Sequence, residues 1–89
     1  MLIRLIRSGG LLALPRRAEL DTSTRPDAAE LERLALEVLA TTPPGPTAAV
    51  PDGYQYLLTV DDDRTVQFAD PALTQAQLHL VERVLGEGA

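Results

Sequence analysis

Short segments rich in apolar residues, several of them alternating with polar ones, predict four β-strands along the chain. The first two are expected at about residues 2–7 and 16–22, joined as a hairpin. The alternation is strictest over residues 54–60, which predicts the third strand. The fourth follows an acidic turn and places Val66 and Phe68 on one face.

A period of three to four residues predicts a first helix that begins after Thr24 and ends near Ala40. Thr24 is the expected N-cap, and Pro26 suits the first turn because its missing N–H would have no partner there. Leu34 is expected at the centre of the buried face. The apolar positions that define this face are Leu31, Leu34, Ala35, Val38 and Leu39.

A second helix is predicted to start at Thr74. Gln77, three residues on, completes a capping box, and Leu73 and Leu78 form the hydrophobic staple around it. Gly86 is the expected C-terminal stop. The buried stripe of this helix is expected to consist of Leu78, Val81, Val84 and Leu85.

The order β-β-α-β-β-α predicts an α+β fold in one small domain, residues 1–89, with a four-stranded antiparallel sheet and two helices on one face. Within the hairpin, Ile3 and Leu5 should share a face and meet Ala18 and Leu20 across the sheet.

Composition excludes several classes of function. The chain has no cysteine, so it can form neither disulfides nor thiolate metal sites, and its net charge of −5 argues against nucleic-acid binding. Arg4 and Arg7 interrupt the first apolar run, which is too short for a signal peptide or a membrane span. We therefore expect a cytoplasmic protein without a membrane partner.

No set of residues with catalytic or metal-binding spacing is found. Asp61-Asp62-Asp63 lacks the ligand spacing of a calcium loop, and His79 is the only histidine. We therefore predict no enzyme activity, no cofactor and no metal site. The Pro- and Gly-rich residues 41–53 are interpreted as a semi-rigid linker, although a functional loop stays open.

The tip of the predicted hairpin is unusual because it is rich in leucine, whereas hairpin tips are usually polar. Such a tip either folds back onto the core or is held out for a partner. Two glycines precede it, and Pro15 and a basic pair follow. The candidate partner-binding residues are Ser8, Gly9, Gly10, Leu11, Leu12, Ala13, Leu14 and Arg16.

Residues 7–11 together with residues 16–22 resemble the N-terminal signature of emfourin-like proteins, small inhibitors of protealysin and other thermolysin-like metalloproteases. Leu11 stands where that family usually has Phe, while Leu12 and Ala13 replace Ala and Gly. The resemblance implies an inhibitor of a thermolysin-like metalloprotease that is monomeric when free. Because such enzymes favour a bulky apolar side chain after the scissile bond, Leu11 would be the leading anchor.

An interaction module without inhibitory activity, such as an immunity-type or regulatory adaptor, is the alternative. In a further alternative the tip packs internally, and the Pro-rich loop or the acidic turn contacts the protease.

Overall fold

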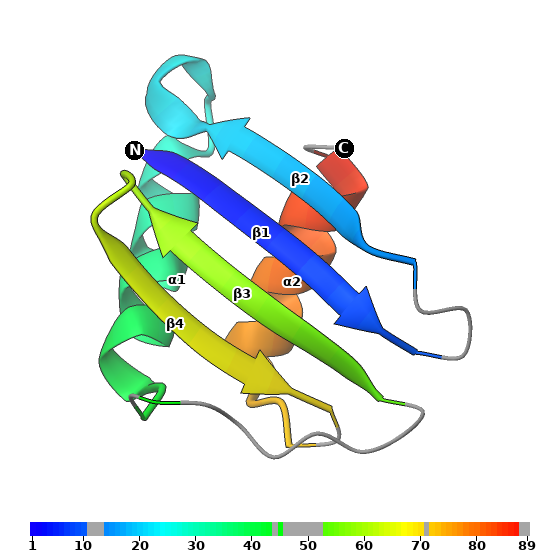
Figure 1. Cartoon of the computed structure of the whole chain (residues 1–89). Helices are drawn as coiled ribbons and strands as arrows, with labels where there is room; N and C mark the ends of the chain where they lie inside the picture. The colour runs from blue at the N-terminus through cyan, green and yellow to red at the C-terminus, as the bar shows by residue number, and fades with distance from the viewer. Residues whose placement is uncertain (11–13, 44, 46–52, 71, 88–89) are drawn as a thin grey trace.

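Four antiparallel strands form one sheet, and both helices pack on the same face of it (Figure 1). The computed structural model describes residues 1–10, 14–43, 45, 53–70 and 72–87. The predicted fold class and element order are confirmed. None of the described helices is long and apolar enough to cross a membrane.

The sheet order is β2-β1-β3-β4, so the first strand of the chain lies between the second and the third. Ile3 pairs with Leu20 and Leu5 with Ala18, as the alternation predicts. The strands are β1 (Leu2–Gly9), β2 (Arg16–Asp21), β3 (Tyr54–Val60) and β4 (Arg64–Ala69).

The core lies between the sheet and the helices α1 (Ala28–Thr41) and α2 (Gln75–Glu87). Helix α2 packs against β1 and β2, and helix α1 packs against β4. On the other face of the sheet, Ile6 and Leu57 lie opposite each other and are only half-buried. The buried apolar residues of the core are Ile3, Leu5, Ala18, Leu20, Leu31, Ala35, Val38, Leu39, Tyr56, Leu58, Val60, Phe68, Leu80, Val81, Val84 and Leu85.

The start of α1 differs from the prediction. Thr24 is not its N-cap, because it belongs to a 3-10 turn, η1 (Thr22–Thr24), that follows β2 directly. This turn has its own cap, since the Asp21 side chain accepts a hydrogen bond from the backbone N–H of Ser23 at 3.0 Å. The hydrogen bond lowers the pKa of Asp21. Helix α1 begins only after Asp27, whose side chain makes no capping hydrogen bond.

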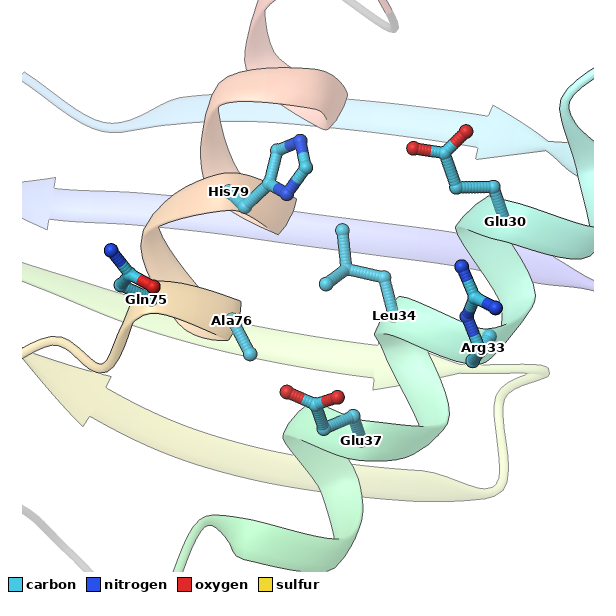
Figure 2. A pocket seen from close by; sticks show the side chains of 7 residues that line it. All are labelled: Glu30, Arg33, Leu34, Glu37, Gln75, Ala76 and His79. Atoms are coloured by element: carbon cyan, nitrogen blue, oxygen red, sulfur yellow. The ribbon is translucent and has the colours of Figure 1, made fainter.

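Leu34 is not at the centre of the buried face of α1. Leu31 and Val38 are fully buried against the sheet, whereas Leu34 is half-buried. It lies in a groove between the two helices and points toward α2 (Figure 2). The buried face of α1 is therefore centred on Leu31, Ala35 and Val38 rather than on Leu34.

The stripe of α2 is also rotated from the prediction. The predicted Leu78 is 46% exposed, whereas Leu80, which was not predicted, is fully buried. The predicted capping box is confirmed: Thr74 N donates to Gln77 Oε1 at 2.8 Å, and Gln77 N donates to Thr74 Oγ1 at 3.1 Å. Gln77 faces inward and donates through Nε2 to Thr42 Oγ1 at 2.9 Å.

The end of α2 is likewise different from the prediction. The helix continues through Gly86 to Glu87, so this glycine is not the stop signal. Its φ is not positive, and an added Cβ would meet no atom within 4 Å. A C-terminal glycine ends a helix only when it adopts the left-handed conformation, which Gly86 does not.

Candidate functional site

The candidate tip lies at one end of the sheet, where β1 ends and β2 begins (Figure 1). Of the predicted residues, Ser8, Gly9, Gly10, Leu14 and Arg16 are described by the structure. Residues 11–13, which include the expected anchor, lie outside the described residues.

The two glycines are required because the chain passes directly against the start of β3. Both have positive φ, +83° at Gly9 and +76° at Gly10. A Cβ on Gly9 would lie 2.8 Å from the carbonyl oxygen of Gly53, and one on Gly10 would lie 2.5 Å from Cε1 of Tyr54. Gly10 N also donates to Gly53 O at 3.1 Å. The base of the tip is therefore fastened to the neighbouring strand.

Leu14 and Arg16 lie on the other side of the tip. The Leu14 side chain is 68% exposed, so it does not pack into the core. Arg16 donates through Nη2 to the carbonyl oxygen of Leu85 at 2.6 Å. A cation near the C-terminal end of a helix is favourable because the last carbonyls carry partial negative charge. Arg16 thus links the hairpin to α2.

Tyr54 adjoins the tip, although sequence reasoning did not assign it to the site. The Arg7 guanidinium lies over its ring, 4.2 Å from the centroid. Its backbone N–H donates to Asp70 Oδ2 at 3.2 Å, and its carbonyl accepts from Asp70 N at 3.0 Å. One feature of the sequence could have pointed to Tyr54: it continues the alternation of β3 at the end of the strand that pairs with the glycines.

The acidic turn, residues 61–63 between β3 and β4, lies at the opposite end of the sheet (Figure 1). Asp61 Oδ1 accepts a hydrogen bond from Leu2 N at 2.7 Å. Arg4 binds Glu19 at 2.9 Å and Asp62 at 2.6 Å, and these carboxylates raise the pKa of its guanidinium. The turn therefore ties strands together. Among the described residues, no three His, Cys, Asp or Glu side chains are grouped as a metal site requires.

The groove between α1 and α2 has a volume of about 270 Å³ (Figure 2). Leu34 and Ala76 form its apolar part, and Glu30, Glu37 and His79 are among its polar lining residues. None of its lining residues carries a hydroxyl or thiol group. A nucleophilic triad of the serine or cysteine type therefore cannot be assembled from these lining residues.

The fold and the candidate site together define a small two-layer α+β protein with an exposed apolar residue at the end of a hairpin. A comparison with protein-family models matches residues 5–85 to the Emfourin family. The chain therefore belongs to the Emfourin family, which is consistent with a protease-inhibitor role and implies an inhibitor rather than an enzyme. Comparisons with curated proteins and with solved structures gave no match.

Proposed function

We propose that this protein inhibits a thermolysin-like metalloprotease by inserting residues 8–14 into the substrate cleft or against its rim. Family membership supports the inhibitor role. The observation that supports the proposed site is the exposure of Leu14. This leucine lies on a hairpin whose base is fastened to β3 and α2. A fixed base reduces the conformational entropy that a loop loses when it binds.

Leu11 is the proposed leading anchor, with Leu12 beside it. The resemblance implies an enzyme that prefers a bulky apolar group after the scissile bond, and Leu11 occupies the position where relatives usually carry Phe. An anchor buried in a pocket typically contributes about 2 kcal/mol or more to binding, which is roughly a thirtyfold change in inhibition constant.

The direct test measures peptide hydrolysis by a thermolysin-like protease with increasing amounts of the wild-type protein and of Leu11→Ala. Leu36→Ala is the matched control, because Leu36 is 47% exposed but lies on α1. We expect Leu11→Ala to raise the inhibition constant about thirtyfold or more with unchanged melting, and Leu36→Ala to leave it unchanged. Unchanged inhibition by Leu11→Ala would contradict the anchor role, and a loss of both inhibition and thermal stability would place Leu11 in the core.

An interaction module that binds without inhibiting is the second candidate. It is favoured by the departures from the family pattern at Leu11, Leu12 and Ala13. Gel filtration separates the two candidates: a stable complex with the protease that still hydrolyses peptide at the uninhibited rate would support the module.

A further inference from the structure

Tyr54 is a partly exposed aromatic residue that does not belong to the buried core. It is the first residue of β3 and pairs in register with Gly9, so it lies at the same end of the sheet as the hairpin tip. Its side chain is 36% exposed, whereas Tyr56, two residues along the same face, is 7% exposed. Tyr56 stacks on Phe68 with 5.4 Å between ring centroids and thus completes the core at this end.

The Tyr54 ring is nevertheless held in one position by its neighbours. Arg7 covers one part of it, 4.2 Å from the centroid, and Tyr56 lies 6.4 Å away at an interplanar angle of 60°. The Gly10 backbone lies so close to the ring edge that a Cβ there would clash with it. Asp70 holds the Tyr54 backbone through both its N–H and its carbonyl group.

Arg7 has an arrangement that folding alone does not explain. Its Nε is buried, and it has no hydrogen-bond partner among the described residues. A buried donor without a partner is unfavourable, so a surface arginine would normally turn toward water or a carboxylate. Here the guanidinium lies over the Tyr54 ring, where the cation–π contact compensates in part.

A rigid, half-exposed tyrosine is well suited to binding a protein. It offers a large contact area and loses little rotamer entropy when it is buried, and tyrosine is enriched among residues that dominate binding energy. We propose that Tyr54 is a second partner-binding residue beside the hairpin tip, held in position by Arg7, and that it contacts the rim of the same protease cleft. This inference rests on the proposed function.

The first test compares inhibition constants of the wild type, Tyr54→Ala and Tyr54→Phe against the thermolysin-like protease. We expect Tyr54→Ala to raise the constant about tenfold or more, and Tyr54→Phe to stay within about threefold because it keeps the ring. Leu36→Ala on α1 again serves as the exposed control. If Tyr54→Ala inhibits like the wild type while Leu11→Ala does not, this inference is overturned and the proposed function stands. If the wild type inhibits no such protease, both fail.

A chemical test detects the contact between Tyr54 and the protease without measuring an inhibition constant. The chain has two tyrosines, so nitration with tetranitromethane followed by peptide mass spectrometry resolves each of them. In the free protein we expect Tyr54 to react faster than the buried Tyr56. In the complex isolated by gel filtration, Tyr54 should be protected. Undiminished nitration of Tyr54 in an inhibited complex would overturn the proposal.

The role of Arg7 is tested by a double-mutant cycle. If Arg7 acts by positioning Tyr54, Arg7→Gln weakens inhibition in the wild type but has no further effect in the Tyr54→Ala background. Arg7→Gln should also speed nitration of Tyr54 in the free protein, and Arg7→Lys should restore part of the inhibition because it retains the cation. Additive losses in the cycle would show that Arg7 does not act through Tyr54.

Discussion

Gly9→Ala is the change that most directly tests how the hairpin is fastened to β3. Gly9 has a φ of +83°, and for a residue with a Cβ the left-handed conformation costs roughly 1–2 kcal/mol. The new Cβ would lie 2.8 Å from the Gly53 carbonyl oxygen, a backbone atom that cannot move aside alone. Separating the strands there would also lose the hydrogen bond from Gly10 N to Gly53 O, which contributes about 1 kcal/mol.

Together these effects predict that Gly9→Ala lowers the free energy of unfolding by about 2–3 kcal/mol, out of the roughly 5–15 kcal/mol typical of natural domains. Urea denaturation followed by circular dichroism measures this loss. Two other glycines serve as controls that separate the conformational cost of a positive φ from the steric cost of the added Cβ. Gly45 has a φ of +99° but nothing within 4 Å of an added Cβ, so Gly45→Ala should show the conformational cost alone.

Gly86 lies within α2 and has neither positive φ nor a close neighbour. Gly86→Ala should therefore stabilise the protein, by at most the roughly 0.5–1 kcal/mol that separates alanine from glycine in a helix interior, because Gly86 is the second-last residue of the helix. From the most to the least stable protein, the expected order is Gly86→Ala, the wild type, Gly45→Ala and Gly9→Ala. If Gly9→Ala lost no more than Gly45→Ala, the close approach of β1 to Gly53 would be wrong.

Two further predictions concern stability. Leu31→Ala is expected to lower the free energy of unfolding by about 2–5 kcal/mol, and Leu34→Ala by less, because Leu34 is only half-buried; equal losses in urea denaturation would contradict this burial. A hydrogen bond from the Arg25 side chain, together with Arg83, holds the pKa of Asp27 below its ordinary value of about 4. The stability that this carboxylate contributes is therefore complete above that ordinary value and is lost as the pH falls through the folded-state pKa. Thermal melts should thus show Asp27→Asn less stable than the wild type at neutral pH, with a difference that shrinks in acid; a constant difference would exclude the ionised carboxylate as its cause.

The strands could be predicted from the sequence because a half-buried sheet requires a period of two, which β3 follows closely. Strand β1 follows it less strictly, since Leu2 and Ile6 make its other face partly apolar. The core face of Ile3 and Leu5 was therefore indicated by their expected partners Ala18 and Leu20 rather than by alternation alone. Helices tolerate small rotations, so the apolar positions alone did not distinguish Leu78 from Leu80 as the buried residue of α2. In the structure Gln77 is buried and Leu80, three residues on, lies on the same buried face, a polar position that a stripe drawn through apolar residues alone does not include.

The candidate site was less predictable because its contacts join segments that are far apart in the sequence. The glycines and the leucine-rich tip were visible as a local pattern, and Leu14 is exposed in the structure. The contact between Arg7 and Tyr54 depends on β1 pairing with β3, a choice that the periodicity of neither strand specifies. The hydrogen bond from Arg16 to α2 likewise depends on which helix lies beneath the hairpin.

The two ends of the sheet differ in which side chains they leave exposed, and this difference makes the proposed site testable. At the end with the acidic turn, Arg4 binds the carboxylate of Glu19 on β2 and that of Asp62 in the turn, so these charged groups are paired with each other within the fold. At the end with the tip, the fastening contacts are made by backbone atoms, by the side chains of Arg16 and Asp70, and by Arg7 over the Tyr54 ring, and they leave Leu14 and part of Tyr54 exposed. Truncating an exposed side chain removes little buried area, so it should change binding with little effect on folding. Truncating a core side chain should instead lower the thermal stability. A tip variant whose melting temperature fell as far as that of a core variant would place the interface elsewhere.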